Sequence, residues 1–171
     1  DPTDLADDAE FLQTKWNPGG LVHRGFAEAL DHVLSSLTAA LDELQGRTLF
    51  TGHSLGAAMA TLLASIRPPD FLYTFGCPRV GNAEFVSTVN EVKNRRFVNC
   101  CDIVTRIPPE NLGELKYTHH GIPIYIDRNG TMSENPVADV INRDRILGAT
   151  DYLEEYAWRI GNVAVRELAD H

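Results

Sequence analysis

The 171-residue sequence lacks several features that mark specialised classes of protein. Its three cysteines, Cys77, Cys100 and Cys101, form no C-x-x-C pair, so the spacing predicts neither a zinc site nor a redox motif. The longest apolar stretch, residues 55–66, is well short of the roughly 20 residues that a membrane-spanning helix needs. No repeat or low-complexity tract interrupts the chain. We therefore expect a single globular unit, in which the cysteines are structural rather than catalytic.

Basic residues are also scarce. Fifteen Lys and Arg stand against 24 Asp and Glu, which gives a formal net charge of −9. Such a domain repels the phosphate backbone of nucleic acids, so nucleic acid is excluded as an expected partner. The first residues show no recognisable signal peptide, and the compartment stays open at this point.

Hydrophobic periodicity predicts two helices before residue 47. Leu5, Ala9, Leu12 and Trp16 recur at helical spacing among acidic residues, which is typical of a short amphipathic surface helix. After a break at residues 17–20, a 3.6-residue period predicts a long helix from Phe26 to near Gly46.

The following segments alternate between strand and helix patterns. Strands are predicted over 47–51, 71–75 and 95–99, and helices over 55–66 and 83–92. This order predicts βαβ units and therefore a mostly parallel sheet covered by helices. A further strand or hairpin arm is expected over 117–126, with a turn at 128–130, and a last helix over 151–164. Residues 129–131 match the N-glycosylation pattern, but a turn explains the Asn-Gly pair without it.

A candidate nucleophile lies between the first of these strands and the next helix. Gly52-His53-Ser54-Leu55-Gly56 satisfies the G-x-S-x-G pattern, in which small residues let strand and helix pass closely on either side of a strained serine. The backbone N–H of Leu55 is then expected to donate to an oxyanion. An inert serine in a glycine-rich turn is the alternative interpretation.

A serine nucleophile needs a base and an acid that orients the base, and the chain order Ser, Asp, His is expected. Asp102 follows the strand predicted over 95–99, where an open α/β sheet carries its sites; a turn or cap aspartate is the alternative. His119, His120 and His171 follow it in the chain. His119 and His120 lie in a predicted strand and face opposite sides, so they cannot share a metal and at most one faces the site.

Several motifs in order resemble the class 3 lipases of the α/β-hydrolase superfamily. The resemblance covers residues 22–171 and rests on VHRGF at 22–26, TGHSLGAA at 51–58, TFGCPRVGN at 74–82, DIVTRIPP at 102–109, YTHHG at 117–121 and DH at 170–171. It implies an α/β-hydrolase fold in which Ser54 is the nucleophile, Asp102 the acid and His171 the base. It also implies no metal or organic cofactor.

Two departures from the family pattern bear on the boundaries of the domain. The family has an Arg-Gly-Ser or Arg-Gly-Thr segment before its lid, whose hydroxyl residue supplies a second oxyanion donor, and the family continues beyond its histidine. Neither feature is present here, and Thr3 is a weak substitute for the donor. We therefore expect residues 1–171 to be part of one larger α/β-hydrolase domain that lacks its N-terminal strands here, with residues 1–16 as a candidate lid.

The sequence thus predicts a carboxylic ester hydrolase, first of all a lipase that hydrolyses acylglycerols at a lipid–water interface. A short-chain or feruloyl esterase is the alternative among enzymes. A non-catalytic α/β-hydrolase-fold binding protein is the alternative from another class, but such proteins usually lose a triad residue and all three positions are filled here. The resemblance slightly favours an extracellular location, whereas acyl-chain preference and oligomeric state stay open.

Overall fold

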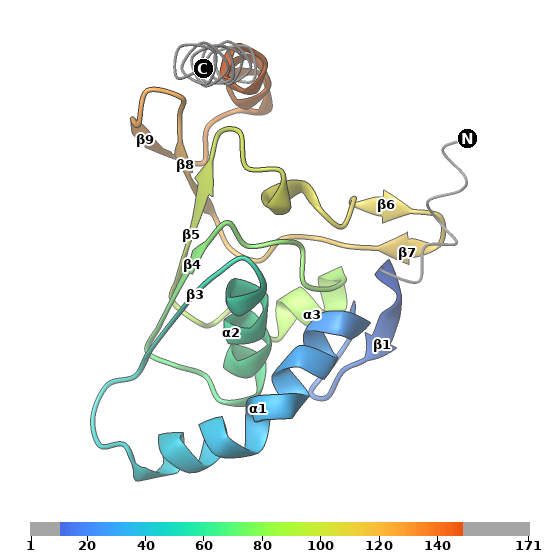
Figure 1. The fold of residues 1–171 in the computed structure, drawn as a ribbon, viewed down its shortest axis with the longest axis vertical. Helices are drawn as coiled ribbons and strands as arrows, with labels where there is room; N and C mark the ends of the chain where they lie inside the picture. The colour runs from blue at the N-terminus through green and yellow to red at the C-terminus, as the bar shows by residue number, and fades with distance from the viewer. Residues whose placement is uncertain (1–10, 149–171) are drawn as a thin grey trace, which may run out of the picture. The chain divides into compact units, whose positions relative to one another are not determined.

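The computed structural model describes residues 11–148 (Figure 1). This part of the chain divides into two compact units. The first contains residues 11–98 and 102–124, and the second contains residues 99–101 and 125–148. A five-stranded sheet has the strand order β3 (Leu49–His53), β4 (Phe71–Phe75), β5 (Asn94–Asn99), β8 (Pro123–Ile126) and β9 (Met132–Glu134). The helix predicted over 151–164 lies outside the described residues.

The first unit opens with a hairpin rather than a helix. Strand β1 (Gln13–Lys15) pairs antiparallel with β2 (Leu21–His23). Gly20, at a φ of 81°, closes the turn between them, and its carbonyl accepts a hydrogen bond from the Trp16 N–H over 3.0 Å. The helix predicted through Leu12 and Trp16 is therefore wrong at its C-terminal end.

Residues 11–16 are also anchored to the rest of this unit, which bears on the candidate lid. The Trp16 indole N–H donates to Ser65 Oγ over 2.9 Å, and the Tyr117 hydroxyl donates to the Phe11 carbonyl over 2.7 Å. The apolar spacing of Trp16 thus reflects contact with the core. Residues 1–10, the rest of the candidate lid, lie outside the described residues.

The long predicted helix is present as α1 (Arg24–Glu43). The His23 side chain caps it by accepting a hydrogen bond from the Phe26 N–H. The apolar stripe of α1 buries Leu30 completely and packs against α2 (Leu55–Ile66). Figure 1 shows α2 between α1 and the strands. Alanines make this close packing possible, and Ala57, Ala58 and Ala64 are fully buried.

The central strands are parallel, as predicted. Strand β3 (Leu49–His53) pairs with β4 (Phe71–Phe75), and β4 pairs with β5 (Asn94–Asn99). The helix α2 connects β3 to β4 and has the predicted bounds. Because parallel strands end at the same edge, the residues after β3, β4 and β5 come together there.

The second connecting helix, α3 (Ala83–Ser87), is shorter than the predicted 83–92. Ser87 Oγ donates to the Glu84 carbonyl and Thr88 Oγ1 to the Phe85 carbonyl, which favours turns over a longer helix. Val89 and Val92 are nevertheless buried in the core that contains Leu72. Their apolar character therefore reflects packing and not helical periodicity.

Short elements follow β5. They are the 3₁₀ helix η3 (Val104–Arg106) and a small antiparallel hairpin of β6 (Asn111–Leu112) and β7 (Leu115–Lys116). Of the strand predicted over 117–126, only β8 (Pro123–Ile126) is present, while Thr118 makes an isolated bridge to Gly81.

In the second unit, the predicted turn at 128–130 leads to β9 (Met132–Glu134). The Asp127 N–H donates to the Thr131 carbonyl, and the Gly130 N–H donates to the Asp127 carbonyl, each over 2.9 Å. Gly130 has a φ of 84°, a conformation that favours glycine. Residues 138–148 then form a helix.

Candidate active site

Ser54 occupies a strained turn between β3 and α2. Its φ of 53° and ψ of −122° lie outside the regions that non-glycine residues normally adopt. The surrounding hydrogen bonds hold this conformation, because the Ser54 N–H donates to the Phe75 carbonyl over 3.0 Å and the Ser54 carbonyl accepts from Ala57 and Ala58. This is the backbone that a nucleophile elbow requires to present a serine hydroxyl at the sheet edge.

The two glycines of the pattern have different surroundings. A Cβ atom at Gly52 would lie 2.3 Å from the carbonyl oxygen of Gly56, so only glycine fits where β3 passes α2. A Cβ atom at Gly56 would meet no atom within 4 Å among the described residues. The predicted close passage thus explains Gly52, whereas no contact of the described chain explains Gly56.

The proposed oxyanion donor, Leu55, is the first residue of α2. The first N–H groups of a helix have no partner within the helix, and the helix dipole favours negative charge beside them. The Leu55 N–H is therefore suited to bind the oxygen of a tetrahedral intermediate formed at Ser54.

Asp102 lies three residues after the end of β5, the strand that pairs with β4. A Cβ atom at Gly76, the residue after β4, would lie 2.6 Å from Asp102 Oδ2 and 3.3 Å from His53 Nε2. Gly76 has a φ of 58° and donates its N–H to the Phe97 carbonyl. Asp102 and the turn at Ser54 therefore both lie against the peptide group that joins Phe75 and Gly76. The sequence interpretation gave Gly76 no role, although a glycine directly after a strand was the available signal.

The carboxylate of Asp102 is held from one side. Its Oδ1 accepts a hydrogen bond from the Val104 N–H over 2.9 Å, and its main-chain carbonyl accepts one from Thr105 Oγ1 over 2.8 Å. Oδ2 has no hydrogen bond to any residue within 11–148. This arrangement orients the carboxylate and leaves one oxygen able to accept from an imidazole N–H.

His119 is buried and bonded elsewhere in the first unit. Its Nε2 lies 2.8 Å from the Thr105 carbonyl oxygen; since a carbonyl only accepts, this nitrogen carries the proton. Burial, followed by the positive charge of Arg96, lowers the pKa of His119 to about 2.

His120 is buried as well, at 3% exposure, and burial followed by the charge of Arg96 lowers its pKa to about 3. Its Nε2 has no hydrogen-bond partner in the described part of the chain. Neither His119 nor His120 bonds to Ser54 or Asp102 there, so neither is placed to act as the base. The prediction that His119 and His120 face opposite sides of a strand is wrong, because residues 117–120 are not in a strand. His171, the predicted base, lies outside the described residues.

Apolar side chains are exposed beside the candidate nucleophile and acid. Leu55 follows Ser54 and is 46% exposed, Ile103 follows Asp102 and is 67% exposed, and Phe75 is 42% exposed. Leucine, isoleucine and phenylalanine are residue types that are most often buried in folded proteins. A separate apolar groove of about 470 Å³ lies between α1, α2 and β3, but neither Ser54 nor Asp102 lines it.

Comparison with known proteins decides the family. Residues 2–112 match the family described as Lipase (class 3). The chain belongs to the class 3 lipase family. Among its relatives, the secreted mono- and diacylglycerol lipase 1 of Fusarium solani is 35% identical over 146 residues, which cover 75% of this chain and 43% of the relative. The lipase of Rhizomucor miehei is 34% identical over 140 residues, which cover 71% of this chain and 38% of that relative.

Solved structures of fungal lipases confirm the α/β-hydrolase fold. A fungal lipase–inhibitor complex, described as a model for interfacial activation, superposes with a TM-score of 0.66 at 31% identity, over 79% of this chain and 57% of that one. The chain spans less than half the length of the two curated relatives. Within residues 11–148, no helix is both long and apolar enough to cross a membrane, and no three metal-ligating side chains cluster.

Proposed function

We propose that this class 3 lipase is a serine carboxylic ester hydrolase that cleaves acylglycerols through an acyl-enzyme. The observation that carries the proposal is the strained backbone of Ser54 at the turn from β3 to α2, with the Asp102 carboxylate against Gly76 at the adjacent strand end. Two relatives named as lipases, from Fusarium solani and Rhizomucor miehei, support the substrate class.

In the first half of the proposed reaction, Ser54 Oγ attacks the ester carbonyl as His171 takes the hydroxyl proton. Asp102 orients the imidazole and stabilises its positive charge. The Leu55 N–H binds the oxyanion; a donor of this kind typically contributes about 3–4 kcal/mol to transition-state stabilisation. The alcohol leaves with the proton from His171, and the acyl group stays on Ser54.

In the second half, His171 removes a proton from water, which attacks the acyl-Ser54 carbonyl. Collapse of the intermediate releases the carboxylic acid and returns the proton to Ser54. No cofactor takes part in the proposed reaction. The family takes a second oxyanion donor from a segment before the lid, and Thr3 is the weak substitute that this sequence offers.

The exposed apolar residues beside the site support a substrate presented at a lipid–water interface. Leu55, Phe75 and Ile103 would contact the apolar part of an ester or the lipid surface itself. We also propose an extracellular location, because the relatives from Fusarium solani and Malassezia restricta are named as secreted. The candidate lid within residues 1–10 stays a prediction.

The test is a substrate series on the full-length protein. Rates are measured on p-nitrophenyl esters of increasing acyl length, on emulsified acylglycerols and on a feruloyl ester, with Ser54→Ala as the control. A lipase prefers the long acyl chains and the emulsion. Preference for soluble short-chain or feruloyl esters would replace the lipase assignment by an esterase, and absence of hydrolysis of every ester would leave a binding protein.

A further inference from the structure

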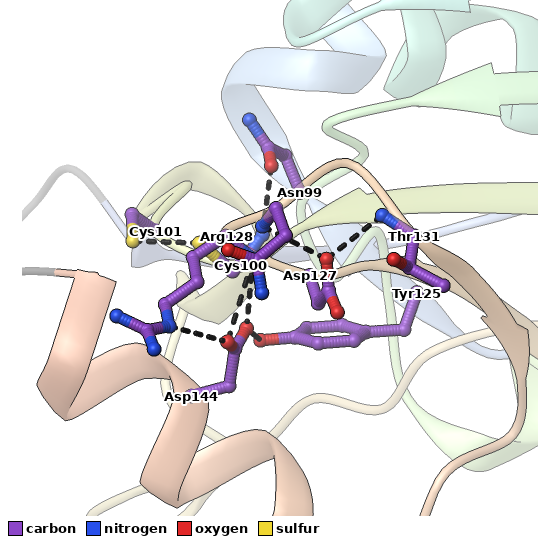
Figure 2. A network of polar contacts seen from close by, with 9 residues as sticks. Asn99, Cys100, Cys101, Tyr125, Asp127, Arg128, Thr131 and Asp144 are labelled. Carbon is purple, nitrogen blue, oxygen red and sulfur yellow. Dashed lines mark hydrogen bonds and ion pairs between the residues drawn. The ribbon is translucent and has the colours of Figure 1, made fainter.

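A second reactive pair of side chains lies in the unit of residues 99–101 and 125–148. Cys100 and Cys101 come directly after β5, and their Sγ atoms are 2.7 Å apart, as the dashed line between them in Figure 2 marks. Both are free thiols. We propose that Cys100 and Cys101 are a redox modification site, which low-molecular-weight disulfides such as oxidised glutathione convert reversibly to a disulfide between these neighbouring residues.

The two thiols differ in access, and this sets the order of the reaction. Cys101 is exposed, whereas Cys100 is only 5% exposed. Thiol–disulfide exchange begins with attack by an accessible thiolate, so Cys101 is the residue that meets a soluble disulfide. Cys100 then resolves the mixed disulfide, because its sulfur already lies against that of Cys101 and no larger thiol needs to enter.

The exchange balances without any other oxidant. The Cys101 thiolate attacks one sulfur of oxidised glutathione, the S–S bond breaks, and one glutathione leaves and takes up a proton. Cys100 loses its proton and attacks Cys101 Sγ, which releases the second glutathione. The two cysteines lose two electrons and two protons, and one molecule of oxidised glutathione becomes two of the reduced form.

Hydrogen bonds hold the backbone of Cys100 in place. Its N–H donates to the Ile126 carbonyl over 2.9 Å and also lies 3.0 Å from Asn99 Oδ1. Its carbonyl accepts from Arg145 Nε over 3.2 Å. Because both peptide groups of Cys100 are fixed, the backbone that carries its thiol is held next to Cys101, which raises the effective concentration of one thiol near the other.

The helix formed by residues 138–148 makes room for both sulfurs. A Cβ atom at Gly148 would lie 2.6 Å from Cys101 Sγ and 3.2 Å from Cys100 Sγ. Any side chain there would push the thiols from their present positions. The absence of a side chain at Gly148 therefore leaves a space that the two sulfurs share.

The electrostatic environment keeps the buried thiol protonated until its partner reacts. Burial, and after it the Cys101 thiol, Asp144 and Asp127, raises the pKa of Cys100 to about 12. Asp144 is itself bound by the Tyr125 hydroxyl over 2.8 Å in the polar network of Figure 2. Cys100 is thus a poor first nucleophile, and conversion of the Cys101 thiolate to a mixed disulfide removes the charge on the Cys101 sulfur, which opposes ionisation of Cys100.

The experiment treats the native full-length protein with oxidised glutathione, quenches it with acid, denatures it and alkylates the remaining thiols. Cleavage after Arg96 and Arg106 places both cysteines on one peptide, residues 97–106. We expect that peptide to be unalkylated and two hydrogen atoms lighter than its reduced form. The three cysteines of the described chain then leave one alkylated thiol, Cys77, and dithiothreitol restores all three.

Three variants separate the steps. Cys100→Ser is expected to retain glutathione on residue 101, because no thiol resolves the mixed disulfide. In Cys101→Ser, the remaining thiols are expected to stay reduced and to be alkylated. Cys77→Ser is the matched control, since Cys77 is buried in the other unit, and it should form the 97–106 disulfide as the wild type does. Persistence of glutathione on Cys101 of the wild type, dimers linked through Cys101, or no loss of thiols would each overturn the proposal.

Discussion

The backbone N–H of Ser54 donates a hydrogen bond to the carbonyl oxygen of Phe75 over 3.0 Å. This bond ties the turn that carries the candidate nucleophile to the last residue of the neighbouring strand, β4. The next residue, Gly76, is the one against which the Asp102 carboxylate lies. The relative position of Ser54 and Asp102 is therefore set through a single peptide, and substitutions at that peptide should affect catalysis more than stability.

Gly76→Ala tests this dependence. The new Cβ atom would lie 2.6 Å from Asp102 Oδ2, so the carboxylate must move, and displacements of this kind cost about 10²-fold in kcat. The left-handed backbone at φ 58° adds roughly 1–2 kcal/mol of destabilisation. Ester hydrolysis and urea denaturation of the full-length variant measure the two effects.

Gly130→Ala is the matched control for backbone strain. Gly130 has a φ of 84°, but a Cβ atom there would meet nothing within 4 Å. It should lose similar stability and keep its kcat. Equal losses of kcat in both variants would show that strain, and not the position of Asp102, accounts for the effect of Gly76→Ala.

Gly52→Ala and Gly56→Ala should differ in stability. At Gly52 the Cβ atom would lie 2.3 Å from a backbone oxygen, and overpacking of this kind costs about 1–3 kcal/mol. At Gly56 nothing opposes the methyl group, so the change should stay within about 1 kcal/mol. Denaturant midpoints of the two variants provide the comparison, and equal destabilisation would contradict the contacts at Gly52.

Asp102→Asn should lower kcat by about 10⁴-fold, because an amide cannot stabilise the imidazolium that forms in the reaction. The fold should change little, since Asn Oδ1 can still accept from the Val104 N–H. Asp70→Asn is the control: this carboxylate also accepts a backbone N–H, that of Thr48, but lies in an exposed turn away from the site. A fall in kcat of less than tenfold in Asp102→Asn would remove Asp102 from the triad.

The buried histidines predict how stability depends on pH. The folded pKa values of His119 and His120 are lowered to about 2 and 3, whereas an unfolded histidine titrates near pH 6.5. Between these values the unfolded chain binds more protons, so the free energy of unfolding falls as the pH is lowered below about 6.5. Each histidine contributes a slope of at most about 1.4 kcal/mol per pH unit.

Replacement of both His119 and His120 by Gln should flatten this slope in urea titrations from pH 7.5 to pH 4.5. His32→Gln, at an exposed position of α1, is the control and should leave the slope unchanged. An unaltered slope in the double variant would mean that these histidines take up protons as readily in the folded protein as in the unfolded chain.

Local sequence signals predicted the elements that tertiary contacts did not override. The helix over 55–66 and the strand over 71–75 have their predicted bounds, because glycine, proline and an apolar run delimit each. Trp16 fitted a helical period and Val89 lay within a predicted helix, but each is placed by packing against the core instead. Periodicity alone does not separate these two causes.

In the candidate site too, the sequence predicted the residues that local patterns mark, and it did not predict the role that depends on a tertiary contact. Ser54 and Asp102 were predicted because the first lies within a motif and the second follows a strand at the expected edge. Gly76 lies in the motif at 74–82, but its role was not predicted, because that role depends on a contact with residue 102 that the sequence around residue 76 does not specify. The role of His171 as the base stays a prediction.

Covalent labelling of the full-length protein with a fluorophosphonate, followed by peptide mapping, tests most directly whether Ser54 is the nucleophile. This reagent reacts only with a serine that a base has activated, and we expect one phosphonyl group per chain, on Ser54, with complete loss of labelling and of ester hydrolysis in Ser54→Ala. Labelling at another serine, or ester hydrolysis that survives Ser54→Ala, would contradict this assignment.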